Sequence, residues 1–438
     1  MDTWAEHAIW WQVYPLGFVG ADPTGADRSC RRPVSAIVGW LDYATELGLS
    51  GLALNPVFAS SGHGYDITDH FALDERLGTD ADLDALLAAC HERGFRVMFD
   101  GVFNHVGRNH PLVVQALAEG PGSPADQYFR ITWPQEWQPG QPPEAVDCFE
   151  GHESLVALDH SSPAVAELVT EAMCHWLDRG IDGWRLDAAY AVPPEFWTRV
   201  LPRVRERHPD AYVVGEVLHG DYAQVVRDSG MDAVTQYELW KAIWSGIRER
   251  NFFETAWSMQ RHDEFLDTFV PWTFIGNHDV TRLASQVPTP EHRPHALVLL
   301  MTLGGTPAVY YGDEQAFTGE KTQTWHGDDA VRPAMPDSPA DLLPFGWPTY
   351  RLHQELIALR RRHPWLHTAR SQQLHLTNTQ FAYRTSGPGG SLVVALNLDA
   401  TPAGIPVDGV SRVEAGAAEL QQDGHLVVLP PNGWAVLA

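Results

Sequence analysis

Short apolar runs alternate with longer stretches of helical periodicity along most of the chain. The apolar runs are rich in β-branched and aromatic side chains, which is typical of strands that are buried on both faces. Strands are expected at residues 9–14, 51–57, 95–102, 183–187, 212–217, 233–236, 274–276 and 307–311. The helices expected between and after them include residues 34–47, 81–93, 163–179, 194–207 and 350–362. A repeated strand–helix unit implies a parallel sheet, and eight strands close a barrel, so the pattern predicts an α/β fold of the (β/α)8 type, a TIM barrel.

The alternation is interrupted after the third expected strand. Residues 104–162 are rich in Pro, Gly, Trp and acidic residues and show little periodicity. A loop of that length inside a compact domain is usually functional. We therefore predict a subdomain at residues 104–162 that is inserted over the mouth of a barrel formed by residues 1–103 and 163–365.

The pattern changes again after His363. Short apolar runs separated by Gly, Pro and Asn turns replace the helices, at residues 373–376, 381–384, 392–397, 426–428 and 434–437. Such runs are typical of an antiparallel β-sandwich, which we place at residues 366–438. This part of the chain is too small to carry the chemistry alone.

The charge balance narrows the class of partner. Of the 438 residues, 56 are acidic and 30 are basic, which gives a formal net charge of −26. A chain of this charge repels phosphate backbones and anionic lipid surfaces. Nucleic acid and membrane are therefore excluded as expected partners, whereas a neutral small-molecule substrate is compatible with the composition.

Cysteine spacing and the first residues favour a cytoplasmic location. Cys30, Cys90, Cys148 and Cys174 are widely spaced and match no zinc motif. Residues 1–11 lack a basic stretch followed by an apolar run, and no apolar run approaches the roughly 20 residues of a membrane span. We expect reduced thiols and no zinc or nucleotide cofactor.

Four of the expected strands end in a carboxylate, often beside a histidine or an arginine. The polar residues at these ends are Asp100 and His105, Arg185 and Asp187, Glu216, and His278 and Asp279. Active sites in such barrels lie at the carboxyl ends of the strands, where these side chains converge. A single carboxylate at a strand end is more often a helix N-cap, so the prediction depends on all four ends together.

Paired carboxylates suit the cleavage of a glycosidic bond. One protonates the leaving oxygen and the other meets the oxocarbenium-like carbon, and in a retaining enzyme the two lie about 5–5.5 Å apart. Arg185 stands two residues from Asp187 and is expected to lower the pKa of that carboxyl, which suits a nucleophile. Glu216 follows a short apolar run, an environment that favours the protonated form and suits the acid.

These segments resemble those of a known family. DGVFNH at 100–105, GWRLD at 183–187, VGEV at 214–217 and NHD at 277–279 are similar, in order, to the four hallmark segments of the α-amylase family of glycoside hydrolases. GYD at 64–66 and YYGDE at 310–314 extend the similarity, which covers nearly the whole chain. The chain also resembles intracellular cyclomaltodextrinases and neopullulanases, although the extra N-terminal β-domain typical of those enzymes does not precede the first expected strand.

The resemblance implies catalytic roles for three carboxylates. Asp187 is the expected nucleophile and Glu216 the expected general acid and base. Asp279 is expected to hold sugar hydroxyls and to stabilise the transition state. The family also implies that Asn104 helps to bind a structural calcium ion, with an Asp at the position that Ala157 occupies here. A hard cation needs several oxygen ligands, so no calcium is expected at that place.

The remaining expected site residues bind the sugar or orient the catalytic groups. By the same resemblance, Tyr65, His105 and His278 are expected to contact the sugar in the −1 subsite, with Tyr65 stacking under its ring. Arg185 is expected to orient the nucleophile, and Asp100 to support Arg185 and the barrel. Taken singly, Arg185, His105 and His278 would more often be structural, whereas for Tyr65 a role in the core is the less favoured alternative.

The leading interpretation is a retaining α-glycoside hydrolase that acts on α-1,4-glucosidic bonds of malto-oligosaccharides, including cyclic and α-1,6-branched ones, through a covalent glycosyl-enzyme intermediate. The first alternative is a transglycosylase with the same carboxylates, in which a sugar replaces water as the acceptor. The second alternative is a non-catalytic sugar-binding barrel, which predicts the loss of a carboxylate, whereas all three are present. A homodimer is compatible with the sequence.

Overall fold

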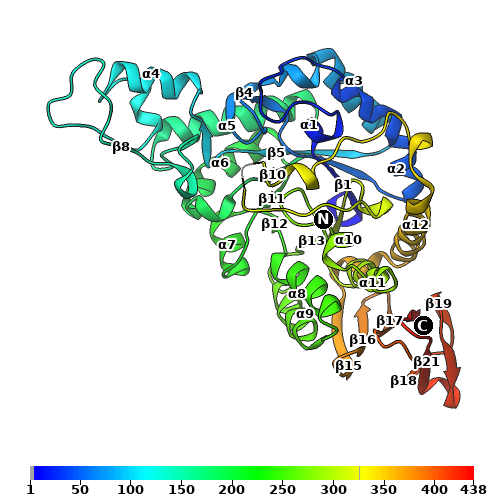
Figure 1. The fold of residues 1–438 in the computed structure, drawn as a ribbon. Coiled ribbons are helices and arrows are strands. Elements are labelled where there is room, and N and C mark those ends of the chain that lie inside the picture. Colours follow the sequence, from blue (N-terminus) through cyan, green and yellow to red (C-terminus); the bar gives the residue numbers. More distant parts are fainter. Residues whose placement is uncertain (1–3, 325) are drawn as a thin grey trace.

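A closed barrel of parallel strands forms the centre of the molecule in the computed structural model, which describes residues 4–324 and 326–438. The eight strands pair in the order β12–β11–β10–β5–β2–β1–β14–β13 (Figure 1). Their bounds are β1 Trp10–Val13, β2 Gly51–Leu54, β5 Arg96–Gly101, β10 Gly183–Leu186, β11 Tyr212–Gly215, β12 Ala233–Val234, β13 Trp272–Phe274 and β14 Thr306–Tyr310. A parallel bridge between Thr235 and Trp272 joins the two outer strands. The predicted (β/α)8 barrel is therefore confirmed.

Helices surround the barrel. They are α1 Pro15–Phe18, α2 Leu41–Leu47, α3 Asp80–Glu92, α5 Pro163–Arg179, α6 Pro194–Arg207, α7 Tyr222–Ser229, α8 Tyr237–Arg248, α9 Phe253–Phe265, α10 Leu283–Gln286, α11 Arg293–Thr302 and α12 Trp347–Arg362. The ends of α5 follow from its sequence: the Ser162 hydroxyl accepts a hydrogen bond from the Ala164 N–H, and Gly180 ends the helix in the left-handed region. The prediction for residues 34–47 was wrong in its first half, since Val34–Trp40 is a 3-10 helix.

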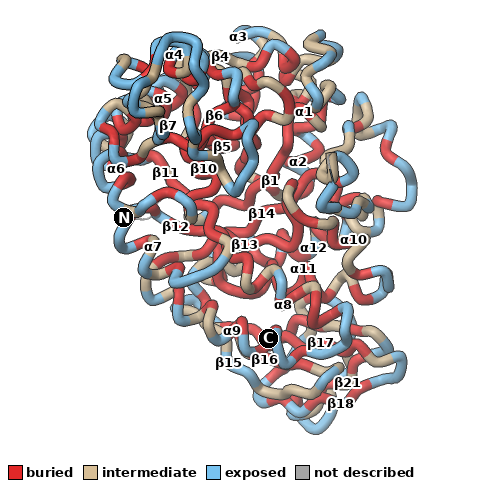
Figure 2. The backbone as a smooth tube through the Cα atoms, turned by 60° about the vertical axis from the view of Figure 1, so that its left-hand side comes forward, coloured by how far each residue is buried: buried red, intermediate tan, exposed pale blue. Residues whose placement is uncertain are grey.

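The barrel strands are buried at the centre of the molecule (Figure 2), and the apolar core around them divides into a large cluster and a smaller one. The interior of the barrel is filled by a small cluster that includes Trp10, Met98, Val214 and Trp272. A Cβ at Gly51 would lie 2.5 Å from Cε3 of the Trp10 ring, so the tight interior requires glycine there. The strand expected at 274–276 lies two residues earlier, because it pairs with β14 from Trp272 to Phe274.

Residues between β5 and α5 form a lobe to one side of the barrel (Figure 1, in cyan and green-blue). The lobe contains α4 Pro111–Glu119 and two short antiparallel strand pairs, β6 His105–Gly107 with β9 Leu155–Ala157 and β7 Ile131–Thr132 with β8 Ala145–Val146. The sequence did not predict α4. The ranges predicted for the inserted subdomain and its neighbours stay predictions.

The C-terminal part contains two antiparallel sheets. One has the strand order β15–β16–β17–β22–β19 and the other β18–β21–β20. The bounds are β15 Arg370–Leu376, β16 Gln380–Gly387, β17 Gly390–Asn397, β18 Ala403–Pro406, β19 Val413–Gly416, β20 Glu419–Gln421, β21 Leu426–Leu429 and β22 Trp434–Leu437. Side chains such as Val393, Ile405 and Val427 form one apolar cluster from both sheets, which confirms the predicted β-sandwich. Among the described residues no helix has both the length and the apolar character needed to cross a bilayer.

Candidate active site

The carboxylates predicted at the strand ends meet at one edge of the barrel. Asp100 lies in β5, Asp187 directly follows β10, and Glu216 directly follows β11. Asp279 lies five residues after β13. The first three are buried, whereas the Asp279 side chain is 28% exposed. The parallel sheet therefore brings together carboxyl groups that are far apart in sequence, as the strand pattern predicted.

One guanidinium group holds three of these carboxylates. Arg185 Nη1 lies 2.5 Å from Asp100 Oδ2 and 3.3 Å from Asp187 Oδ1. Its Nη2 lies 2.7 Å from Glu216 Oε1. Asp187 and Glu216 therefore flank the same buried cation. Because a buried arginine is costly to leave unpaired, these contacts fix the two carboxyl groups relative to each other.

The pKa of Asp187 is raised well above its usual range, and the expectation of a lowered pKa was wrong. Burial is the main cause, and the charge of Glu216 adds to it, while Arg185 acts in the opposite direction. The sequence placed Arg185 beside Asp187 but did not reveal that Arg185 is shared with two other carboxylates. Burial and the neighbouring charge therefore make the proton of Asp187 harder to remove than that of an isolated carboxyl.

Glu216 is held from three sides. Besides its contact with Arg185, its Oε2 accepts a hydrogen bond from the Ala188 N–H at 3.0 Å, and its Oε1 accepts one from the Tyr237 hydroxyl at 3.0 Å. The Asn277 amide donates to that hydroxyl at 2.9 Å. Tyr237 and Asn277 were not among the predicted site residues. Asn277 stood next to two predicted residues, but only the fold places Tyr237 at the site.

The Asp279 carboxylate lies between the imidazole of His278 and the guanidinium of Arg332. Its Oδ2 lies 2.7 Å from His278 Nε2, and its Oδ1 lies 2.9 Å from Arg332 Nη2. Burial acts to raise the pKa of Asp279, but His278 and Arg332 outweigh it and hold the pKa well below the usual range. Arg332 is a site residue that the sequence reading missed. It also stacks over the ring of Tyr14, with its guanidinium carbon 4.7 Å from the ring centre.

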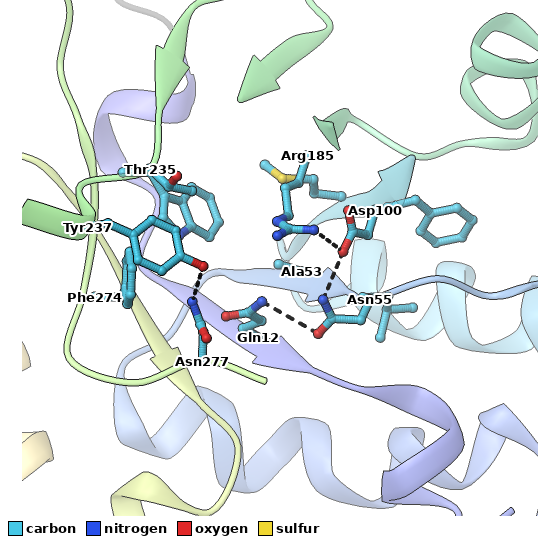
Figure 3. A pocket seen from close by; sticks show the side chains of 13 residues that line it. Gln12, Ala53, Asn55, Asp100, Arg185, Thr235, Tyr237, Phe274 and Asn277 are labelled. Carbon is cyan, nitrogen blue, oxygen red and sulfur yellow. Dashed lines mark hydrogen bonds and ion pairs between the residues drawn. The ribbon is translucent and has the colours of Figure 1, made fainter. Parts of the chain in front are cut away.

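A polar floor lies beneath the carboxylates. The Tyr65 hydroxyl contacts His278 Nε2 and lies 3.1 Å from Asp100 Oδ2, and the Tyr65 and His278 rings are nearly parallel, with centres 5.6 Å apart. Asn55 donates to Asp100 at 2.9 Å, and Gln12 approaches Asn55 at 3.5 Å (Figure 3). Gln12 and Asn55 were also not among the predicted site residues. The floor keeps Asp100 in place and so supports Arg185.

His105 connects the barrel with the lobe that follows β5. Its ring stacks on Phe149 with centres 4.7 Å apart and an angle of 13° between the planes. Burial lowers the pKa of His105 to about 3, so this ring is neutral at physiological pH. A neutral imidazole at the site can bind a hydroxyl without adding charge.

The site opens into a cavity of about 1130 Å³. The predicted residues that line it are Tyr65, His105, Asp187, Glu216 and Asp279. The other three predicted residues, Asp100, Arg185 and His278, are not among the described residues that line this cavity. They lie beneath the lining residues and contact them, so the structure places them as support.

The residues around Asn104 do not fit the calcium ion that the family resemblance implies. The Asn104 amide nitrogen lies 3.1 Å from His105 Nδ1, and its backbone carbonyl accepts the Leu158 N–H. Ala157 contributes a methyl group and no oxygen ligand from its side chain. Among residues 4–324 and 326–438 no group of three His, Cys, Asp or Glu side chains could hold a metal ion.

A family model described as "Alpha amylase, catalytic domain" matches residues 12–347. The chain belongs to the α-amylase family. It is thus a glycoside hydrolase by family, and the resemblance read from its strand ends is confirmed.

Named relatives in the α-amylase family support the assignment. A cyclomaltodextrinase from Bacillus sp. is 30% identical over 422 residues, which cover 91% of this chain and 74% of the relative. An intracellular maltogenic amylase from Bacillus subtilis is 26% identical, over 72% of this chain and 57% of the relative. The acarbose-soaked debranching enzyme of Nostoc punctiforme superposes with a TM-score of 0.82 at 26% identity, over 99% of this chain and 98% of that structure.

Proposed function

We propose that this protein is a retaining α-glycosidase that hydrolyses α-1,4-glucosidic bonds of malto-oligosaccharides, with α-1,6-linked and cyclic glucans in its substrate range. The observation that carries the proposal is the arrangement of Asp187 and Glu216 on the two terminal nitrogens of Arg185, at the base of a cavity that Asp279 also lines. A retaining mechanism needs a nucleophilic carboxylate and a carboxylic acid close to each other, and the shared guanidinium of Arg185 supports such an arrangement.

The proposed chemistry assigns each carboxylate one task. Asp187 attacks the anomeric carbon while Glu216 protonates the departing oxygen, which gives a glycosyl-enzyme ester. Glu216 then takes a proton from water, and the water oxygen displaces Asp187 from the anomeric carbon with a second inversion. Asp279 accepts hydrogen bonds from the sugar hydroxyls, and its low pKa keeps it ionised for this role.

Arg185 serves both carboxylates in this division. Burial and the charge of Glu216 raise the pKa of Asp187, and Arg185 opposes them. Attack requires the proton on Glu216 and the charge on Asp187. Arg185 contacts both groups, so either can carry the charge without losing its cation.

The names of the relatives guide the choice of substrate. The cyclomaltodextrinase and the maltogenic amylase are named for cyclic glucans and maltose, and the debranching enzyme for branch points. The cavity exceeds the 300–1,000 Å³ usual for a small-molecule site, so it has room for several sugar units. Similarity to an enzyme named as intracellular supports a cytoplasmic location. The homodimer stays a prediction.

Product analysis tests the proposal directly. Purified protein is incubated with linear, cyclic and branched α-glucans, and the anomer released first is followed by proton NMR. We expect the α-anomer, and we expect no product from Glu216→Gln. Glu75→Gln, which changes an exposed carboxylate paired with Arg28, serves as the matched control and should behave like the wild type. Release of the β-anomer, or undiminished activity of Glu216→Gln, would refute the proposal.

A further inference from the structure

The helix pair α8 and α9 forms a wall of the cavity, and of this wall the proposed catalytic chemistry uses only Tyr237, at the start of α8. Glu238 and Lys241 from α8, and Glu254 and Trp257 from α9, line the cavity together with the carboxylates. Trp257 is 58% exposed, so the folded chain leaves more than half of this large apolar side chain in water. An indole left in water at the rim of a substrate cavity is available to a ligand.

This indole is held in a fixed position. The guanidinium of Arg261 lies over its ring, 5.3 Å from the centre. Arg261 is itself anchored by two contacts to Glu238, at 2.9 and 3.2 Å. One face of Trp257 is thereby covered and its orientation set, so a ligand that stacks on it has little side-chain freedom to remove.

The charges beside Trp257 are balanced in pairs. Lys241 Nζ lies 2.5 Å from Glu254 Oε1, and the Ser245 hydroxyl donates to Glu254 Oε2 at 3.1 Å. Together with the Glu238–Arg261 pair, this gives a wall with many hydrogen-bond donors and acceptors and no excess charge. Such a wall suits a neutral ligand rich in hydroxyl groups better than an ion.

The wall is continuous with the proton donor. Helix α8 begins at Tyr237, whose hydroxyl donates to Glu216. Trp240, one turn later, packs edge-on against Tyr237 with ring centres 5.8 Å apart and lines the same cavity. Since Glu216 faces the leaving-group oxygen in the proposed reaction, this side of the cavity belongs to the leaving group.

We propose that Trp257, with Trp240 and the Lys241–Glu254 pair, forms a distal subsite for the glucan segment on the leaving-group side of the cleaved bond. A pyranose ring of that segment stacks on the open face of Trp257, and its hydroxyls bond to the neighbouring charged pairs. The inference rests on the proposed function. It adds that the protein favours chains long enough to extend from Glu216 to α9, and that this subsite holds the acceptor when a sugar replaces water.

The test compares Trp257→Ala with Phe253→Ala. Phe253 lies one turn earlier on α9, is 52% exposed, and is not among the described residues that line the cavity. We measure kcat/KM on linear malto-oligosaccharides of increasing length and on an α-maltosyl fluoride, whose leaving group leaves the distal subsite empty. We also measure the ratio of transfer to hydrolysis at high oligosaccharide concentration.

In Trp257→Ala we expect about a tenfold lower kcat/KM on the longest substrates, mainly through KM, and a lower transfer ratio. The rate on the fluoride should stay within about twofold of the wild type, Trp257→Tyr should restore most of the loss, and Phe253→Ala should match the wild type throughout. An unchanged length dependence, or an equal loss on the fluoride, would overturn the inference. A wild type that turns over none of these substrates would instead refute the proposed function.

Discussion

The Tyr237 hydroxyl donates a hydrogen bond to Glu216 at 3.0 Å, and it is itself held by Asn277 at 2.9 Å. Removing that hydroxyl in Tyr237→Phe takes away one of the contacts that orient the proposed acid. Because Glu216 is protonated when it acts as the acid, the bond counts as an ordinary one of about 0.5–1.5 kcal/mol, so we expect kcat/KM on malto-oligosaccharides to fall roughly 2- to 10-fold.

A substrate whose leaving group needs no proton serves as the control for Tyr237→Phe. Fluoride departs without protonation, so hydrolysis of an α-glucosyl fluoride should fall much less in Tyr237→Phe than hydrolysis of an oligosaccharide. Equal losses on both substrates would show that Tyr237 acts on something other than proton transfer.

The nucleophile can be identified by trapping. A 5-fluoro-α-glucosyl fluoride forms the ester quickly and loses it slowly, so the intermediate accumulates. We expect peptide mass spectrometry to find the added sugar on Asp187, which is buried beside Arg185. Asp187→Asn should show no label and at least about a thousandfold lower kcat. Label on Asp100 or Asp279 would reassign the nucleophile.

Arg332 controls the ionisation of Asp279. Its contact at 2.9 Å helps to hold the pKa of Asp279 below the usual range, so the carboxylate persists at low pH. Arg332→Met removes that cation, and the pKa of Asp279 should therefore rise. Because activity requires the ionised form, the acid limb of the profile of kcat/KM against pH should move to higher pH, with about a tenfold loss at its maximum. Arg28→Met, which removes a pair with Glu75 outside the cavity, should leave the profile unchanged.

Glu314 couples stability to pH. Burial raises the pKa of this side chain to about 7, and its Oε2 has no hydrogen-bond partner in the described part of the chain. The folded pKa lies above the unfolded one, so the contribution of Glu314 to stability is present below about pH 4.5 and is lost as the pH rises to about 7.

We therefore expect the free energy of unfolding of Glu314→Gln to exceed that of the wild type increasingly as the pH rises from about 4.5 to about 7, by up to about 3 kcal/mol. Urea denaturation at a series of pH values measures the difference. The Tyr43 hydroxyl donates to Glu314 Oε1 at 3.0 Å, and glutamine can keep that bond. A difference between the two proteins that does not vary with pH would show that Glu314 does not ionise in the folded state.

The elements with local start and stop signals were the ones that the sequence predicted best. Helix α5 was predicted to the residue because Ser162 and Pro163 begin it and Gly180 ends it. Helix α4 was missed because its N-cap is an unusual one: His110 accepts the Leu112 N–H with its ring. Pro111 at its first position and Gly120 after its end match the usual signals, but in a stretch this rich in Pro and Gly they do not mark a helix.

The candidate site likewise contains residues that the sequence predicted and residues that it did not. Carboxylates that end strands could be found because a barrel must gather its strand ends at one edge. Arg332 contacts Asp279 from 53 residues away, and Tyr237 contacts Glu216 from 21 residues away. Both lie outside the strands, so only the folded chain brings them to the site. The pKa of Asp187 was misjudged for the same reason, since burial and the sharing of Arg185 are tertiary effects.

The barrel closes between β12 and β13 through the bridge of Thr235 with Trp272 and the hydrogen bond from the Gln236 N–H to the Trp272 carbonyl, at 2.9 Å. Tyr237 follows β12 and Asn277 follows β13, so the hydrogen bond between them spans the point where the barrel closes. The same tyrosine orients the proton donor Glu216. If warming first loosens the contact between β12 and β13, Glu216 loses its alignment while the rest of the barrel is still folded, and activity should therefore be lost at a lower temperature than the fold.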